Sequence, residues 1–424
     1  MSTPLRSERA RPARLRPERR RRGDLVAAAV LVVLVLGAVV AVWRTSAVAG
    51  ADSDPAAVAI TAPPHADGVP AGFAEAWRAA SGATAAPVVA GPAVVTGDGG
   101  SVHGRDAVAG GVAWSYTRDR PLCTVAAGFP DSDDGRGQVL ALYEGGTSYC
   151  SELTTLRPAT GERVAASNPD VRPGTRLLAR GGFVVATGSE YLEVLRSDLV
   201  KTLEYGDVPT PVQVGRQPRP ECTYGSVVLA QERVGVLERC PGEPTDRLTV
   251  LAADGEDGAE TPQEEFSVPL PAAGATLVAL SADRAAVALP DPPRLQLLDT
   301  TGQQVGLIPL DVPDADLTGG AAVTEVTPDA VYWWTGSRTV ALDATDLAPL
   351  WTADGTLGPA VPYGGGLLVP VPSGLQELDP ATGAALRTIP VRRTDPQAPV
   401  RAAAAGEVLL EQRGAEVVAL RPAG

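Results

Sequence analysis

Carboxylates are abundant in this sequence, whereas histidine and lysine are nearly absent. Its 424 residues include 50 Asp and Glu, but only two histidines, His65 and His103, and one lysine, Lys201. A histidine metal site or a Ser-His-Asp triad within one chain is therefore close to excluded. Paired carboxylates could support acid–base catalysis, yet no pair is singled out by its position. We accordingly predict no catalytic, cofactor-binding or metal-ligating residue.

Two short segments partly match ligand-binding loops. Residues 131–135 (DSDDG) are similar to the start of a calcium loop, but Gly135 stands at the fifth ligand position and no Glu follows at the twelfth. Residues 97–100 (GDGG) are rich in glycine, but no helix pattern follows them to complete a phosphate site. Both segments are more simply read as turns between strands.

The N-terminal region predicts export and membrane attachment. Residues 1–23 carry nine Arg against Glu8 and Glu18, and residues 25–43 (LVAAAVLVVLVLGAVVAVW) carry no charge. Such a helix spans about 28 Å, close to the bilayer core of about 30 Å. The positive-inside rule keeps the basic end in the cytoplasm. We predict a basic cytoplasmic tail at 1–23, a single-pass transmembrane helix at 24–43, and an extracytoplasmic body attached to the cell membrane.

Two alternatives share the prediction of export. Ala47-Val48-Ala49 offers a cleavage site for a signal peptide, although the apolar run exceeds the usual length of about 7 to 15 residues. Residues 21–25 also approach a twin-arginine export motif.

The formal net charge of −14 lies outside the basic tail, so the body of the protein is acidic and nucleic acid is not an expected partner.

The body has the composition of an all-β domain. Residues 44–72 are small, acidic and Pro-containing, which predicts a flexible tether, and deleting residues 51–70 is expected to leave the melting temperature unchanged. Beyond Gly72, short runs rich in Val, Leu and Ala alternate with clusters of Gly, Pro and Asp. This alternation predicts many short strands.

The body also repeats, with a mean period of about 45 residues that is typical of four-stranded propeller blades. Trp114 follows Asp106 by eight residues, as Trp351 follows Asp343. The same order of strands and turns occurs in residues 91–114, 329–351 and 364–386. Unit starts fall near Pro87, Leu122, Gly174, Thr223, Ala275, Ala321, Gly358 and Pro399.

At these residues the chain resembles the pyrroloquinoline-quinone-like (PQQ-like) β-propeller repeat family. The resemblance covers most of residues 73–424 and is good in the first, sixth and seventh units but poor in the third and fourth. It implies that Trp114 and Trp351 pack between neighbouring blades. The composition, rich in Ala, Arg, Gly and Pro with one Lys, favours a GC-rich bacterial source of actinobacterial type.

The resemblance does not extend to a recognisable quinone site. Quinone dehydrogenases of this family hold the cofactor over the central channel on an aromatic platform, with a divalent cation and often a disulfide between adjacent cysteines. This sequence has no adjacent Cys pair and only 4% aromatic residues. The resemblance therefore implies the fold, and we predict no cofactor.

The unit starts predict an eight-bladed β-propeller, with seven blades as the alternative if the third and fourth units merge. The eighth unit begins near Pro399 and lacks its last strand. Residues 73–79 (FAEAWRA) align with residues 347–353 (LAPLWTA) of the sixth unit, which places Trp77 on Trp351. Because an unpaired edge is a liability, we predict that 73–79 closes a propeller of residues 73–424, with Trp77 also between blades.

The four cysteines fit this arrangement of strands. Disulfides persist in oxidising compartments, and four cysteines allow three pairings, with free buried thiols as the alternative. Cys123 and Cys222 open the inner strands of their units, whereas Cys150 and Cys240 lie near the ends of the second strands. Antiparallel pairing brings such positions together. We predict the disulfides Cys123–Cys150 and Cys222–Cys240.

Two classes of function remain. The favoured hypothesis is a non-catalytic, membrane-anchored extracytoplasmic propeller that binds or scaffolds an envelope protein, a peptide or a cell-wall polysaccharide. The alternative is a carboxylate-based hydrolase or lyase at the propeller channel, and a quinone-dependent dehydrogenase is the least favoured. An enzyme would need two or three carboxylates that converge on the channel with shifted pKa values.

Overall fold

The computed structural model describes residues 22–44, 49–132, 135–146, 149–211, 213–255, 258–317 and 319–423. The basic tail predicted at 1–23 lies outside these ranges except for its last two residues. Asp133 and Asp134 of the calcium-like segment, and Ala47-Val48 of the cleavage site, also lie outside them. The chain falls into two units, residues 1–51 and 52–424.

The first unit contains α1 (Arg22–Arg44), in which residues 23–44 are exposed. Asp24 lies in its first turn and Arg44 in its last, which suits the helix dipole. Among the described residues this is the one helix long and apolar enough to cross a membrane. Its position near the N-terminus fits a single-pass anchor or a signal sequence.

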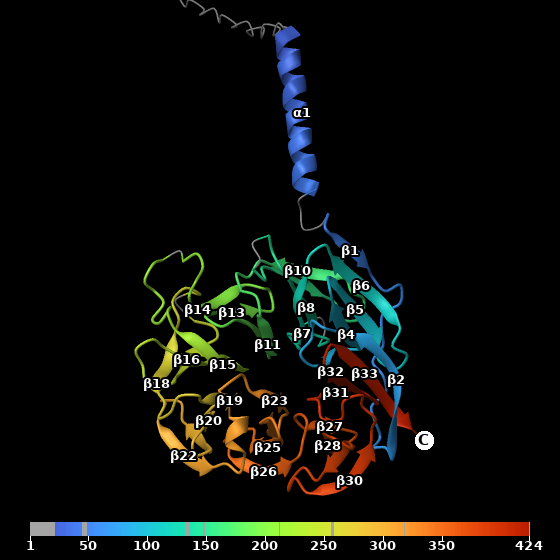
Figure 1. Cartoon of the computed structure of the whole chain (residues 1–424). Helices are drawn as coiled ribbons and strands as arrows, with labels where there is room; N and C mark the ends of the chain where they lie inside the picture. The colour runs from blue at the N-terminus through green and yellow to red at the C-terminus, as the bar shows by residue number, and fades with distance from the viewer. Residues whose placement is uncertain are drawn as a thin grey trace, which may run out of the picture. The chain divides into compact units, whose positions relative to one another are not determined.

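In the second unit eight antiparallel sheets form the blades of a ring (Figure 1). From the innermost strand outward, blade 1 contains β3 (Val88–Ala90), β4 (Ala93–Asp98), β5 (Ser101–Asp106) and β6 (Val112–Arg118), and blade 2 contains β7 (Leu122–Gly128), β8 (Gln138–Tyr143), β9 (Glu152–Leu156) and β10 (Arg163–Ser167). In the same order, blade 3 contains β11 (Arg176–Arg180), β12 (Phe183–Thr187), β13 (Tyr191–Arg196) and β14 (Lys201–Gly206). Blade 4 contains β15 (Thr223–Ala230), β16 (Arg233–Arg239), β17 (Arg247–Ala252) and β18 (Glu264–Pro269).

Blade 5 contains β19 (Thr276–Leu280), β20 (Ala285–Leu289), β21 (Arg294–Leu298) and β22 (Gln304–Pro309), and blade 6 contains β23 (Val323–Val326), β24 (Ala330–Trp334), β25 (Arg338–Asp343) and β26 (Pro349–Asp354). Blade 7 contains β27 (Val361–Tyr363), β28 (Gly366–Val371), β29 (Gly374–Leu378) and β30 (Ala385–Pro390). Blade 8 contains β31 (Arg401–Ala405), β32 (Val408–Arg413), β33 (Glu416–Ala423) and, as its outer strand, β2 (Gly72–Ala80). A short 3₁₀ helix, η1 (Asp314–Asp316), precedes blade 6. The predicted eight-bladed propeller is confirmed.

Burial within a blade depends on the position of the strand. All six residues of β8 are buried, because a middle strand is covered on both faces by the neighbouring blades. Five of the six residues of the outer strand β30 are exposed. The middle strands therefore read as continuous apolar runs, which is why the repeats are visible in the sequence.

The ring closes through β2, which supplies the outer strand of blade 8 and covers the predicted residues 73–79. β2 pairs antiparallel with β33, from Gly72 opposite Ala423 to Ala80 opposite Glu416. The two ends of the propeller sequence thus share one sheet (Figure 1).

The three predicted inter-blade tryptophans make the same contact. Each lies in the outer strand of one blade, and its indole Nε1 donates a hydrogen bond of 2.8–2.9 Å to a turn of the next blade. The pairs are Trp77 with Ala107, Trp114 with Pro158 and Trp351 with Pro380. A glycine of the same turn leaves room for each indole: Gly110, Gly161 and Gly383, respectively.

Gly383→Ala tests this contact. Gly383 has φ +69°, and a Cβ there would lie 2.6 Å from Trp351 Cδ2. We expect a loss of about 3 kcal/mol in unfolding free energy, the sum of left-handed backbone strain and the steric clash. Gly355→Ala is the matched control, because its φ is +65° with open space around the Cβ, and it should cost about 1–2 kcal/mol. Equal losses in urea denaturation would contradict the contact.

Both predicted disulfides are confirmed. Cys123 pairs with Cys150 and Cys222 with Cys240, at Cα separations of 6.2 and 4.2 Å. Each bridge lies within one blade and closes a loop of moderate length, with sequence separations of 27 and 18 residues between the partners. Each therefore restrains one blade rather than joining two.

The segment between α1 and β2 differs from the predicted tether. Residues 51–71, here called the strap, begin with β1 (Ala51–Asp54), which adds a fifth strand to blade 1 outside β6. Ile60 of the strap is buried. Strap backbone groups make hydrogen bonds of 2.7–2.9 Å to blades 2, 7 and 8: Ala56 to Thr160, Ile60 to Ala159, Val69 to Arg387 and Pro64 to Glu407. The strap is packed on the propeller through these backbone hydrogen bonds and through Ala66 and Val69, which pack against the core of blades 7 and 8.

Candidate ligand-binding channel

The innermost strands surround a cavity of about 570 Å³. Its walls come from blades 1 to 6 and from β31 of blade 8, and they are mostly Ala, Val and Leu. Small-molecule sites commonly enclose roughly 300–1,000 Å³. The channel therefore has the dimensions of a ligand site.

Four charged residues line this cavity. Arg176 and Arg180 come from β11, Glu325 from β23 and Arg401 from β31. In the part of the chain that the structure describes, none of the three guanidinium groups has a hydrogen bond or an ion pair. Among the described lining residues, Glu325 is the one acidic side chain. The channel thus carries excess positive charge in a protein whose formal net charge is −14.

The pKa shifts of these groups reflect their enclosure. Burial raises the pKa of Glu325, although attraction to Arg401 and Arg180 opposes the rise. Burial lowers the pKa of Arg401, and repulsion from Arg176 lowers it further. Arg176 is open to water along the channel, yet the surrounding strands lower its pKa by desolvation. The folded protein therefore bears an electrostatic cost at this site.

Glu325→Gln is expected to stabilise the protein increasingly as the pH rises from about 4 to about 7. Burial raises the folded-state pKa of Glu325, so folding favours the protonated form of this side chain. The stability that this preference contributes is complete below the unfolded-state pKa, and it is lost as the pH rises through the folded-state pKa. The melting temperature of the variant minus that of the wild type should grow across this range. Glu232→Gln, at an exposed turn, controls for the loss of one formal charge. A difference for Glu325→Gln that falls with pH would contradict the shift.

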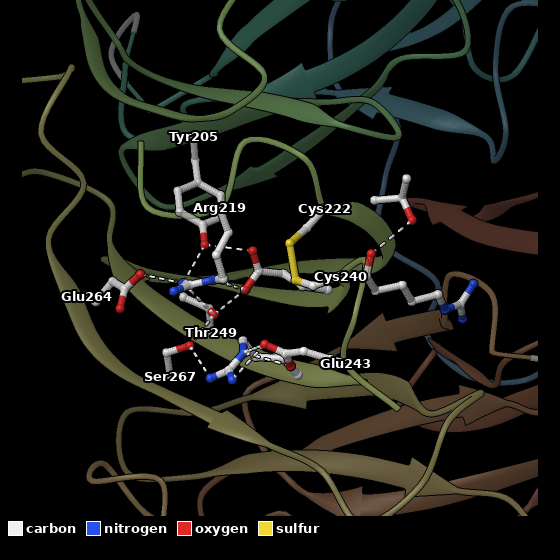
Figure 2. Close-up of a disulfide and its surroundings, with 12 residues drawn as sticks. Tyr205, Arg219, Cys222, Cys240, Glu243, Thr249, Glu264 and Ser267 are labelled. Carbon is white, nitrogen blue, oxygen red and sulfur yellow. Dashed lines mark hydrogen bonds and ion pairs between the residues drawn. A yellow bond between two sulfur atoms is a disulfide. The ribbon is translucent and has the colours of Figure 1, made fainter. Parts of the chain in front are cut away.

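The second disulfide lies beside a buried polar cluster, shown in Figure 2. Arg219 donates hydrogen bonds to Glu238 (3.1 Å) and to the Tyr205 hydroxyl (2.7 Å), and that hydroxyl donates to Glu238 (2.7 Å). Cys222, Glu238 and Cys240 are close enough together to suggest a metal site. However, the two sulfurs are bonded to each other and Glu238 is paired with Arg219. The cluster is therefore a structural network that joins blades 3 and 4.

The channel does not have the carboxylate arrangement expected of a hydrolase or lyase. Such an enzyme needs two or three converging carboxylates, and the described lining residues provide one. Sequence reasoning identified the disulfides and the tryptophans but missed the channel arginines. The available signal was their position, because Arg176 and Arg401 are the first residues of innermost strands, where the other units have Val, Leu or Thr.

No family model matches the chain, and a search of curated proteins finds no match. Many solved structures are similar to it. Three of them are the quinohemoprotein alcohol dehydrogenase ADHIIG from Pseudomonas putida HK5 (12% identity, TM-score 0.51, 86% of this chain and 78% of that one), the C-terminal WD40 domain of Sif2 (11%, 0.52, 84% and 100%) and BamB from Moraxella catarrhalis (15%, 0.47, 82% and 99%). At these identities, the first two likenesses concern the fold alone. They support the β-propeller fold.

Proposed function

We propose that this protein is a non-catalytic binding or scaffolding module, anchored in the cell membrane through residues 25–43 with its propeller outside the cytoplasm. Its ligand would be an envelope protein, a peptide or a cell-wall polysaccharide. The observation that carries the proposal is the channel, which has the volume of a ligand site and one acidic group among its described lining residues. Two disulfides and the apolar helix support the location.

Crosslinking in the native envelope tests this function. The turns between first and second strands lie on one face of the ring, and the turns between second and third strands lie on the other. A photo-crosslinking residue at exposed Asp283 samples the first face, and one at exposed Ser373 samples the second. We expect a discrete adduct from one face only. Equal, diffuse adducts from both faces, or protection of both positions from an externally added reagent, would contradict the proposal.

A further inference from the structure

We propose that the channel binds a small aliphatic oxyanion with two or more negative charges, held by the guanidinium groups of Arg176, Arg180 and Arg401. This inference goes beyond the proposed binding function, because it assigns the channel a small ligand in addition to the envelope partner. Guanidinium groups pair in a bidentate manner with carboxylates and phosphates. Carboxylate and phosphate ligands therefore share the chemistry that the site offers.

The unpaired state of the arginines is the main argument. Lining charges are usually neutralised by protein partners, because an uncompensated charge removed from bulk water costs free energy. Arg176 and Arg401 are close enough for mutual repulsion, and Glu325 can offset only one of the three positive charges. A ligand with two or more negative charges would neutralise the remainder.

The walls define the rest of the ligand. Ala126, Val227, Leu229 and Leu280 contribute apolar surface, and the described lining residues include no aromatic side chain. A flat aromatic molecule would therefore find no stacking partner there, which favours an aliphatic body.

A second cavity, of about 480 Å³, shares Arg180 with the channel. It is lined by turns of blades 1 to 3, in which Gly91 and Gly181 have φ values of +48° and +54°. Arg136 and Gln138 also line this cavity. The second cavity offers a route by which a ligand could reach Arg180 from the face that carries the turns between first and second strands.

Calorimetric titration of the full-length protein in detergent tests the proposal, with citrate and pyrophosphate as probes at low salt and choline as the cationic control. We expect one saturable site that weakens with added salt, and the stronger probe distinguishes carboxylate from phosphate ligands. Arg176→Gln and Arg401→Gln should each weaken binding about tenfold or more, because each removes charge-assisted hydrogen bonds. Glu325→Gln should tighten it. Arg196→Gln, at the exposed end of β13, is the matched control and should leave affinity unchanged.

Either of two outcomes would overturn the proposal. One is the absence of binding for both probes at millimolar concentration, and the other is binding that the channel variants leave unchanged. Because the channel arginines lack partners in the described structure, their Gln variants should keep the wild-type melting temperature or exceed it, and this measurement verifies folding. If neither probe binds while the envelope adduct still forms, the oxyanion proposal fails and the binding function stands. If a probe binds and is chemically converted, the oxyanion site stands and the non-catalytic function fails.

Discussion

Deletion of residues 73–79 should lower the melting temperature of the propeller by about 10 °C or more, taking roughly 2–4 °C per kcal/mol and a loss of about 5 kcal/mol. The deleted strand is the outer strand of blade 8, and without it β33 presents an unpaired edge. Trp77 would no longer donate its hydrogen bond to Ala107 of blade 1. Phe73, which packs edge-to-face with Tyr363 of blade 7 at 5.4 Å, would also be lost. One strand therefore connects blade 8 to both of its neighbours.

Deletion of residues 51–70 is the comparison. The composition of this segment predicts no change, but the strap's hydrogen bonds and the buried Ile60 predict a smaller loss of about 2 kcal/mol in unfolding free energy. Thermal unfolding followed by circular dichroism should place the two deletions in this order. Equal melting temperatures would show that β2 does not close the ring. Trp77→Ala and Phe73→Ala separate the two contacts without removing the strand.

The tryptophans illustrate what the sequence can predict. Trp114 and Trp351 stand at equal spacing from an Asp, and the resemblance of this repeat to PQQ-like propellers implies that both pack between blades. Their partners Gly161 and Gly383 follow Thr in the same repeated turn, but the sequence does not reveal which blade that turn contacts. Such a contact joins residues that become neighbours only when consecutive blades are stacked.

The strap and the channel show why other features escaped prediction. The strap is held by backbone hydrogen bonds and by a few small apolar side chains, and composition gives no sign of these contacts. The channel groups Arg176, Glu325 and Arg401 come from blades 3, 6 and 8 and share a cavity only because the ring closes. Repeat patterns describe one blade at a time, whereas a channel site depends on positions in several blades.

Among the polar sites of the molecule, a buried ionic cluster between blades 7 and 8 should give the largest loss of unfolding free energy on substitution. Arg393, in the connection between these blades, pairs with Glu411 of β32 through two hydrogen bonds of 2.7 and 3.0 Å. It also donates to the carbonyl oxygens of Val371 (2.7 Å) and Gly374 (2.8 Å) of blade 7. The side chains of Arg393 and Glu411 are 1% and 0% exposed, respectively. Arg393 thus joins a carboxylate of one blade to the backbone of the other.

Arg393→Met should therefore lower the free energy of unfolding by about 3 kcal/mol, because it leaves a buried carboxylate and two carbonyl groups without their main donor. Arg413 still pairs with Glu411, which keeps the loss from being larger. Arg393→Lys should recover only part of it, since an ammonium group cannot reproduce the bidentate contact. Arg196→Met, which breaks the exposed pair with Asp198, should leave the urea midpoint unchanged. Similar midpoints for Arg393→Met and Arg196→Met would show that the buried cluster does not hold the two blades together.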